Sequence, residues 1–408
     1  MSVITISSGI FCEKEPVIRK VLEKTGYKLF TDKDIVAEAG RISGMAENKI
    51  RNAFSSKTSV FNKFTYEKER TVAWIRLAIA RLLSQDNLLI EGFAAHLIPR
   101  EISHVLRICL IADMKFRIAG AEKALKSDEK GAVSLIHKQD ENFTVWINTL
   151  FRVKDPWDMS LYDIVIPTDK TEADSIVEII EGNLRSEVIC PTDASKKMVQ
   201  DFVLAANVEV ALAKEGHSVG VTSRDGSVTL TINRHVLMLA RLEDDLKSVA
   251  NKVPGVSSVE TRVGKGYHQA DIYRKYDFEM PSKVLLVDDE REFVQTLSER
   301  LYMREMGAAV VYDGESALDM VRDDEPEVMI LDLKMPGIDG IEVLRKVKET
   351  RPEIEVIILT GHGSDADRES CMKLGAFAYL QKPADINLLS ETLKKANEKI
   401  RKKKADDK

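Results

Sequence analysis

The stretch VMILDLKMPGIDG at residues 328–340 decides the fold of the last third of this 408-residue chain. It joins an apolar run, which ends at Asp332, to a turn that contains two glycines. Helix-like stretches separate it from similar apolar runs at 284–287 (VLLV), 308–312 (AAVVY), 356–359 (VIIL) and 378–380 (AYL). This alternation predicts a flavodoxin-like domain, in which a doubly wound, five-stranded parallel sheet carries helices on both faces.

Acidic residues follow two of these runs. Asp288 and Asp289 end the first run, and Asp332 ends the third. In a doubly wound sheet the chemistry lies outside the carboxyl ends of the strands, and neighbouring strands are about 4.8 Å apart. Carboxylates at that spacing raise one another's pKa unless a cation lies among them, and hard oxygen ligands suit Mg²⁺. The sequence therefore predicts a magnesium site at this edge.

A hydroxyl and an ammonium complete the set. Thr360 ends the fourth run, Lys382 follows the fifth, and Pro383 would fix the next loop through a cis peptide bond. The ammonium and the cation would neutralise a phosphoryl group on Asp332, and the hydroxyl would donate a hydrogen bond to it. The alternative is that the acids only cap helices. That explains a single Asp at one strand end, but not five suited residues at the ends of four strands.

Residues 283–400 resemble the receiver domain of two-component response regulators. The matching motifs are VDDE, DLKMPGIDG, LTGHGS and AYLQKP, in the order and at the spacing of that family. The resemblance implies that a histidine kinase or phosphotransfer protein supplies the phosphoryl group. It also implies a protein output partner, which the sequence does not identify, and leaves open a homodimer through the receiver.

The resemblance gives the acidic residues their roles. It implies that Asp332 is the phospho-acceptor. Asp289, Asp332 and the backbone carbonyl of Lys334 would hold Mg²⁺. Asp288 would act on the ion directly or through water.

The remaining residues of the edge would bind the phosphoryl group and respond to it. The resemblance implies that Lys382 and Thr360 contact it. Thr360 and Tyr379 would form the switch pair, in which the hydroxyl moves to the phosphoryl group and the aromatic ring swings inward.

Strand-like and helix-like stretches also alternate over the first 185 residues, which predicts a second parallel α/β sheet. The loop after its first strand, SSGIFCEKEP at 7–16, stands where a phosphate loop would lie. Such a loop needs glycines so that backbone N–H groups can approach an anion. This one has only Gly9, followed by bulky or negative residues, and is a poor phosphate site.

Residues 3–185 resemble the cytidylate-kinase-like branch of the nucleoside monophosphate kinases. The resemblance rests on ITIS, GYKLFTDKDIV, LLIEGFAAHLI, LRICLIADMKFRIAGA and SLYDIVIPTDK. It implies a P-loop-kinase-like α/β fold. Residues that match the family are Asp32, Gly92, Arg117, Tyr162 and Asp163. Candidates for nucleotide binding are Gly9, Lys14, Asp32, Arg117 and Asp163.

Three departures from that family remove groups that would hold phosphate. The glycine-rich loop becomes Phe11-Cys12-Glu13-Lys14, the arginine after Gly92 becomes Phe93, and a lid arginine becomes Phe143. Phosphoryl transfer depends on positive charge and positioning, so we expect a kinase fold without kinase activity. The alternative is a receiver-regulated nucleoside monophosphate kinase that uses ATP, with Lys14 in place of the loop lysine.

The middle of the chain, residues 189–265, is expected to form a small αββαβ module. The pair Asp225-Gly226 between SVGVTS and SVTLTI is a strong hairpin signal. With the later VPGVSSVETRV, the segment is similar to the BON module. That resemblance, without a lipid anchor, implies a docking role between the other two domains.

An aromatic set occupies one further segment of the first domain. Phe61, Phe64, Tyr66 and Trp74 lie close to Arg70. These rings form either a base-stacking surface or core and partner-facing packing, and packing is the commoner use.

Composition limits the function classes. Sixty Lys and Arg against 66 Asp and Glu give a net charge of −6, which disfavours a protein that coats nucleic acid. No apolar run approaches the roughly 20 residues that span a bilayer, so no transmembrane segment is expected. Four separated cysteines without a CxxC pair fit a reducing cytoplasm.

The expected multidomain α/β organisation is a kinase-like domain at 1–188, the αββαβ module at 189–265, a linker at 266–282, the receiver at 283–401 and a basic tail at 402–408. The basic run Arg401 to Lys404 is expected to follow the last helix. No helix-turn-helix or basic recognition helix is found, so a DNA-binding output is not expected. The sequence predicts a phosphorylation-switched response regulator whose upstream domains serve as a binding or scaffold output.

Overall fold

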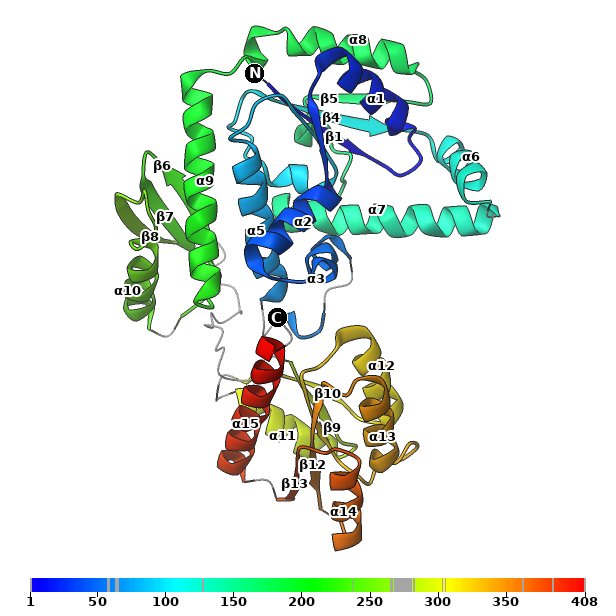
Figure 1. Ribbon diagram of the computed structural model, residues 1–408, viewed down its shortest axis with the longest axis vertical. Coiled ribbons are helices and arrows are strands. Elements are labelled where there is room, and N and C mark those ends of the chain that lie inside the picture. The colour runs from blue at the N-terminus through cyan, green and yellow to red at the C-terminus, as the bar shows by residue number, and fades with distance from the viewer. Residues whose placement is uncertain are drawn as a thin grey trace. The chain divides into compact units, whose positions relative to one another are not determined.

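The computed structural model describes residues 2–406, except 57–58, 63–65, 127, 237, 265–266, 268–280, 282, 303, 305, 362 and 384. The chain divides into two compact units (Figure 1). The first unit comprises Met1–Thr58 and Lys68–Tyr273, and the second comprises Ser59–Glu67 and Arg274–Lys408. The segment Ser59–Glu67 therefore belongs with the receiver, although the expected boundaries assign it to the kinase-like domain.

The first unit is built on a parallel sheet in the order β2-β3-β1-β4-β5. Its strands are β1 (Val3–Ser8), β2 (Lys28–Thr31), β3 (Leu88–Glu91), β4 (Val105–Ile111) and β5 (Ile164–Pro167). Alternate side chains of β1 enter different buried clusters, Val3 on one face and Ile4 and Ile6 on the other. The sheet is thus covered on both faces, as the sequence predicts.

Two groups of helices cover this sheet. The cluster that contains Ile4 and Ile6 is completed by α1 (Lys14–Thr25) and α8 (Ala173–Leu184). The other face carries α2 (Asp32–Ser43), α5 (Glu67–Leu82), α7 (Glu129–Phe151) and η2 (Phe93–Leu97). Shorter elements are α3 (Glu47–Arg51), η1 (Asn52–Phe54), α6 (Met114–Leu125), η3 (Met159–Leu161) and η4 (Glu187–Ile189).

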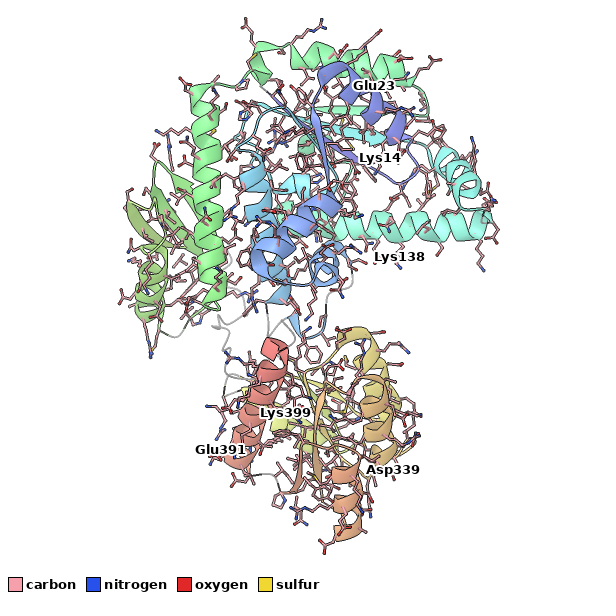
Figure 2. The ribbon with its side chains drawn as sticks, viewed as in Figure 1. Lys14, Glu23, Lys138, Asp339, Glu391 and Lys399 are labelled. Carbon is pink, nitrogen blue, oxygen red and sulfur yellow. The ribbon has the colours of Figure 1, made fainter. Side chains whose placement is uncertain are left out.

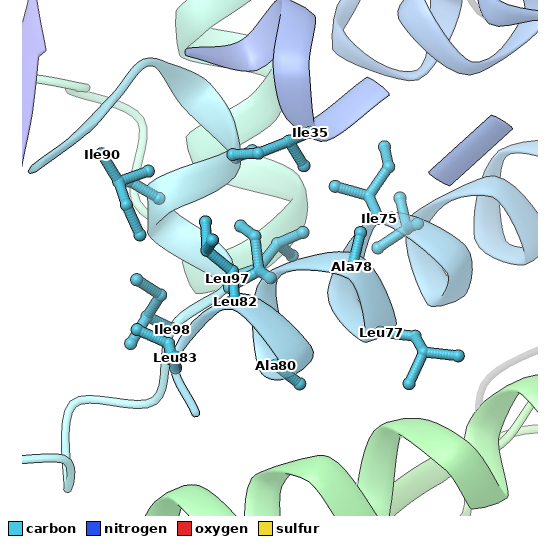
Figure 3. Close-up of a cluster of buried hydrophobic side chains, with 14 of the residues drawn as sticks. Ile35, Ile75, Leu77, Ala78, Ala80, Leu82, Leu83, Ile90, Leu97 and Ile98 are labelled. Carbon is cyan, nitrogen blue, oxygen red and sulfur yellow. The ribbon is translucent and has the colours of Figure 1, made fainter. Parts of the chain in front are cut away.

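Helix α5 lies in the centre of that second face. Figure 3 shows Ile75, Ala78 and Leu82 of α5 among side chains from α2, β3 and η2. Apolar residues occur on nearly all sides of α5, which is typical of a helix buried inside a domain rather than on its surface. The kinase-like core is therefore organised around α5.

The middle module has the predicted element order. It consists of α9 (Asp193–Lys214), β6 (Gly220–Arg224), β7 (Ser227–Ile232), α10 (Leu239–Ala250) and β8 (Ser258–Val263). Strands β6 and β7 pair antiparallel, and Asp225 and Gly226 between them have φ values of 55° and 80°, the left-handed values of a type I′ hairpin turn. Strand β8 joins β7 in parallel.

Helix α9 connects this module to the kinase-like core because it has two buried faces. Phe202 and Ala206 pack into the kinase-like cluster, whereas Val208 and Leu212 pack with the module's strands. Arg76 of α5 also pairs with Glu209 of α9 at 2.5 Å. The module and the kinase-like domain thus form one compact unit.

The second unit contains a parallel sheet in the order β10-β9-β11-β12-β13, which is the flavodoxin-like order and confirms the predicted fold. Its strands are β9 (Val284–Val287), β10 (Ala308–Val311), β11 (Val328–Leu331), β12 (Glu355–Thr360) and β13 (Ala378–Gln381). One face packs against α11 (Arg291–Tyr302) and α15 (Ile386–Asp406), and the other against α12 (Gly314–Asp324), α13 (Gly340–Thr350) and α14 (Asp365–Lys373).

The C-terminal basic run differs from expectation. Helix α15 continues to Asp406, so the run from Arg401 to Lys404 lies within the last helix instead of after it. Lys399, labelled in Figure 2, and Lys403 lie one turn apart and reach 2.9 Å and 3.6 Å from the buried Glu355. These contacts explain why the helix extends. The expected linker at 266–282 lies outside the described residues, apart from Tyr267 and Pro281.

Candidate functional site

Three carboxylates converge at the carboxyl edge of the receiver sheet, as predicted. Asp288 and Asp289 follow β9 and Asp332 follows the neighbouring β11, because Val287 and Leu331 are paired in register. One oxygen from each carboxylate lies within 4.8 Å of the other two. Burial raises the pKa of Asp288, and its contacts with Lys382 and the Glu290 amide counteract that rise only in part. Such an oxygen-only, negatively charged set suits Mg²⁺.

Lys382 supplies the positive charge at this edge. Its Nζ lies 2.7 Å from Asp288 Oδ2, 2.7 Å from Glu290 Oε1 and 3.4 Å from Asp332 Oδ2. Burial lowers the pKa of Lys382, but the hydrogen bonds with Asp288 and Glu290 outweigh burial and raise it above its ordinary value. The side chain is therefore an ammonium. The Lys382–Pro383 bond is cis, as predicted.

Glu290 is a partner that the sequence reasoning missed. It follows Asp289 in the VDDE motif, and its carboxylate turns toward Lys382, which comes from a strand end 92 residues later. An acid immediately after the predicted pair was the available signal. Its side chain is 63% exposed, so the Lys382–Glu290 contact faces solvent.

A tight loop holds Asp332 in place. Asp332 Oδ1 accepts a hydrogen bond from the Leu333 amide at 2.8 Å, and the Asp332 amide donates to the Val287 carbonyl at 2.9 Å. A Cβ on Gly340 would overlap with the Asp332 carbonyl, so only glycine fits there. Lys334, the predicted carbonyl ligand, is exposed and lies two residues beyond Asp332 in the same loop.

The predicted switch residues lie at the next two strands. Thr360 ends β12 and is 1% exposed, and its carbonyl accepts a hydrogen bond from the Lys382 amide at 2.9 Å. Tyr379 pairs with Ile358, and its ring packs against the buried cluster on the α12–α14 face. Among the described residues its buried hydroxyl has no hydrogen-bond partner. A Cβ on Gly363 would overlap with this hydroxyl, so the ring occupies space that Gly363 leaves open.

In the kinase-like domain, the loop after β1 lies against Arg117, a cation that is paired with an acid of the same domain. Arg117 is 5% exposed and lies over Gly9, where a Cβ would come within 3.0 Å of the guanidinium. Its Nε donates to the Ile10 carbonyl at 3.0 Å, and its two terminal nitrogens donate to the Asp140 carboxylate at 2.9 Å and 2.7 Å. The bidentate pair with Asp140 and the bond to Ile10 together occupy all three nitrogens of Arg117.

Lys14 is also paired internally. Its ammonium, on the first turn of α1 (Figure 2), lies 2.6 Å from Glu91 Oε1 at the end of β3. Nearby, the Asp32 carboxylate accepts hydrogen bonds from the amides of Phe93 and Ala94 at 2.8 Å and 2.9 Å. Burial raises the pKa of Asp32 to about 6 despite these bonds.

The two phenylalanines that replace the family's arginines meet each other. The rings of Phe93 and Phe143 stack with centroids 4.7 Å apart and an interplanar angle of 7°. Trp157 and His96 contact Phe143 edge-on at 5.1 Å and 5.3 Å, and Phe143 is 1% exposed. Where the resemblance implies two cations for phosphate, the structure contains a buried aromatic cluster.

The predicted nucleotide-binding residues are only partly brought together. Gly9 and Arg117 are in contact, and Asp32 and Lys14 lie at the same carboxyl edge, around Glu91 and Gly92. Asp163 instead precedes β5, and its carboxylate accepts a hydrogen bond from the Arg107 amide at 2.8 Å. Arg107 is paired with Thr5 of β1, which is four residues before Gly9. At about 3.3 Å per residue Asp163 is too far from Gly9 to share a phosphate.

A cleft of about 340 Å³ opens beside the start of α1. It is lined by Glu13 and Val17, by Phe116 of α6 and by the loop 168–172 that follows β5. The cleft offers a ring, apolar groups and one ammonium, Lys170, and its lining also includes the acids Glu13, Asp169 and Glu172. Apolar walls with a few polar groups suit a small organic ligand.

Comparisons with known proteins agree with this geometry. Residues 284–394 match the family described as response regulator receiver domain, and residues 3–170 match the cytidylate kinase-like family. The transcriptional regulatory protein CpxR of Escherichia coli (strain K12) is 43% identical over 102 residues, which are 25% of this chain and 43% of CpxR. Response regulator MprA of Mycolicibacterium vanbaalenii is 33% identical over 128 residues, 31% of this chain and 54% of MprA.

A solved response regulator receiver domain protein from Clostridium thermocellum is 34% identical, covers 30% of this chain and 97% of its own, and gives a TM-score of 0.28. The chain spans about half the length of the curated relatives, at 43% and 54%. In the part of the chain that the structure describes, no helix is both long and apolar enough to cross a membrane. The chain therefore combines a cytidylate kinase-like domain at residues 3–170 with a response regulator receiver domain at residues 284–394.

Proposed function

We propose that this protein is a response regulator whose switch is the phosphorylation of Asp332 by a histidine kinase or phosphotransfer protein. The observation that carries the proposal is the convergence of Asp288, Asp289 and Asp332 within 4.8 Å, next to the ammonium of Lys382. Three carboxylates, those of Asp288, Glu290 and Asp332, contact one ammonium, and Asp289 adds a fourth negative charge beside Asp288 and Asp332. This excess of negative charge favours a bound cation. The cation and Lys382 together would then balance the charge of a phosphoryl group on Asp332.

In the proposed reaction, a carboxylate oxygen of Asp332 attacks the phosphorus of a phosphohistidine. The P–N bond breaks, its electron pair stays on the imidazole nitrogen, and an acyl phosphate forms on Asp332. Asp288, Asp289, Asp332 and the Lys334 carbonyl are the residues that would hold Mg²⁺, which when bound neutralises charge on the phosphoryl oxygens. Lys382 then donates to a phosphoryl oxygen, and the Thr360 hydroxyl donates to another.

The test uses the full chain, a low-molecular-weight acyl phosphate and Mg²⁺. We expect the intact mass to increase by one phosphoryl group in the wild type and none to be added in Asp332→Asn. Asp339→Asn is the matched control, because Asp339 is an exposed carboxylate that caps α13 in the same loop. Absence of any mass gain in a folded, Mg²⁺-supplied wild type contradicts the proposal.

We further propose that the kinase-like domain is a binding or scaffold output without phosphoryl-transfer activity. The internal pairs Lys14–Glu91 and Arg117–Asp140, and the stack of Phe93 on Phe143, support this view because they occupy or replace the cations that phosphate needs. The alternative, a receiver-regulated nucleoside monophosphate kinase, requires these pairs to open.

Incubation with ATP·Mg²⁺ and CMP, with and without beryllofluoride on the receiver, separates the two. We expect ADP formation at the background rate in both conditions. Turnover in the usual kinase range of roughly 1–100 s⁻¹ contradicts the proposal. Binding of a nucleotide in the cleft beside α1, without turnover, agrees with it.

A homodimer through the receiver and a docking role for the BON-like module remain predictions. Sedimentation velocity with and without beryllofluoride tests the first, because a phosphorylation-dependent dimer increases the sedimentation coefficient only when the mimic is bound.

A further inference from the structure

Phe61 lies in an unexpected place. In the chain it follows η1 and precedes α5, inside the span that matches the cytidylate kinase-like family. In the structure it is 0% exposed and belongs to the same buried cluster as Leu285, Val287 and Leu331 of the receiver strands. A phenylalanine from the first domain's sequence is therefore part of the receiver's core.

The end of this segment is fixed to the receiver by charge. Glu67 Oε2 lies 2.8 Å from the ammonium of Lys283, which immediately precedes β9. The Lys283 side chain is only 14% exposed. Between the two anchors, the Tyr66 amide donates to the Asn62 carbonyl at 2.9 Å, and Tyr66 is 4% exposed. Phe61 and Glu67 thus contact the receiver, the first through a buried ring and the second through a largely shielded ion pair.

Glu67 is also the first residue of α5, the helix at the centre of the kinase-like core. The segment is therefore covalently continuous with the most buried helix of the first unit. Helix α5 in turn is joined to α9 by the Arg76–Glu209 pair. Any displacement of segment 59–67 changes the restraint on the first turn of α5.

Phe61 also shares its cluster with the groups around the phosphorylation site. Leu331 and Leu333 flank Asp332 and belong to that cluster, and the Tyr379 ring packs against it. Packed cores change between discrete arrangements instead of deforming continuously. Repacking of Tyr379 or Leu333 therefore changes the cluster in which Phe61 is buried.

We propose that residues 59–67 are the receiver's binding partner within the chain, and that the kinase-like domain senses phosphorylation through this segment and α5. The partner that the receiver surface selects is an aromatic anchor followed six residues later by an acid. This inference rests on the proposed function of Asp332. The aromatic set was expected either to stack on bases or to pack. Phe61, Tyr66 and Trp74 are buried, so they pack. Phe64 lies outside the described residues.

The test is hydrogen–deuterium exchange of α5 in the full chain, with and without beryllofluoride and Mg²⁺, while ¹⁹F NMR reports binding of the mimic. In the wild type we expect exchange of the first turns of α5 to change at least threefold. Phe61→Ala is expected to bind the mimic and to lose this response. Val60→Ala is the matched control, because Val60 is the neighbouring residue and is 43% exposed.

A charge exchange tests the same contact without opening a cavity. Glu67→Lys is expected to reduce the response of α5, and the double variant Glu67→Lys/Lys283→Glu to restore it. The inference is overturned if α5 in Phe61→Ala responds as in the wild type, or if α5 is unresponsive in a wild type that has bound beryllofluoride. A wild type that does not bind beryllofluoride overturns the proposed function itself, and the ¹⁹F signal distinguishes that outcome.

Discussion

The two parallel sheets of this protein share an architecture and differ in the charge at their carboxyl edges. In the receiver, the Lys382 ammonium contacts Asp288, Glu290 and Asp332, and Asp289 lies beside two of these acids, so negative charge is in excess. In the kinase-like domain Lys14 and Arg117 are each paired with one acid, and Phe93 and Phe143 stack on each other. A site keeps affinity for a charged ligand only where its own charges are not balanced.

Of the two edges, only the receiver edge is destabilised by its own charges. Like charges at the receiver edge repel, and burial makes ionisation of Asp288 harder, so the edge is destabilised until a cation binds. At the kinase-like edge, Lys14 and Arg117 already have acidic partners within the domain. Changes at the two edges should therefore have opposite effects on stability and function.

The largest expected effect comes from removing charge at the receiver edge. Asp288→Asn/Asp289→Asn should reduce phosphorylation of Asp332 by an acyl phosphate at least a hundredfold, because two of the oxygen ligands lose their charge. Without Mg²⁺ its melting temperature should not fall below that of the wild type, since the repulsion is relieved. Mass spectrometry and calorimetry check both parts. A large loss of stability in the Mg²⁺-free variant would show that the acids stabilise the fold.

The next effect is at the aromatic cluster. Phe143→Arg restores the arginine that the family resemblance implies, but in this chain it buries a guanidinium without an acid and should cost about 3–5 kcal/mol of unfolding free energy. Phe143→Leu should cost less, roughly 1 kcal/mol, since the site stays apolar. Urea denaturation measures both. Full stability together with ADP formation in Phe143→Arg would mean that the edge is an intact phosphate site.

A third effect is a pair of opposing pH dependences in the kinase-like unit. Burial raises the pKa of Asp32 from 3.8 to about 6, so the folded protein binds more protons there and unfolding free energy falls as pH rises from about 4 to 6. Burial lowers the pKa of His96 from 6.5 to about 4, so its contribution rises with pH over about the same range. Each contribution is about 3 kcal/mol, so in the wild type they nearly cancel.

Two variants separate these contributions. Relative to the wild type, Asp32→Asn should gain stability with increasing pH between about 4 and 6.5, and His96→Asn should lose it. Thermal denaturation at half-unit pH intervals measures the slopes. If both variants follow the wild type, Asp32 and His96 titrate alike in the folded and unfolded chain, and burial at this edge has no electrostatic consequence.

The smallest effect concerns the receiver's switch. Gly363→Ala places a methyl group where the Tyr379 hydroxyl lies, so the ring must move outward. We expect phosphorylation of Asp332 to persist within about twofold and stability to fall by about 1–2 kcal/mol, a typical cost of overpacking. NMR of the labelled Tyr379 ring follows its position. Gly361→Ala is the control, because a Cβ there meets only the Lys382 side chain at 3.8 Å. An unchanged ring signal in Gly363→Ala contradicts the expected displacement.

Much of the fold could be predicted because apolar periodicity is a local property. The receiver's strands, the Asp225-Gly226 hairpin and the αββαβ order of the middle module occur where the pattern places them. Strand β2 was missed because its four residues are partly or largely exposed and form no apolar run. It is recognised as a strand only through its pairing with β3.

The candidate site likewise contains residues that the sequence predicted and residues that it missed. Asp332, Thr360 and Lys382 were predictable because parallel strands bring their carboxyl ends to one edge. Asp163 was misplaced because a matched motif does not say at which end of its strand a residue lies. Glu290 was missed because its role depends on a lysine 92 residues away.

The sequence by itself determined the receiver's order of strands and helices and the acids at its edge, because these follow from local pattern and strand-end geometry. It also indicated the two domain families, through their motifs. Only the tertiary structure decided how charges and rings are paired. Lys14 with Glu91, Arg117 with Asp140, Phe93 with Phe143 and Phe61 with the receiver core are all contacts between residues far apart in the chain. Their energies depend on distance and burial in three dimensions, which periodicity along the chain does not specify.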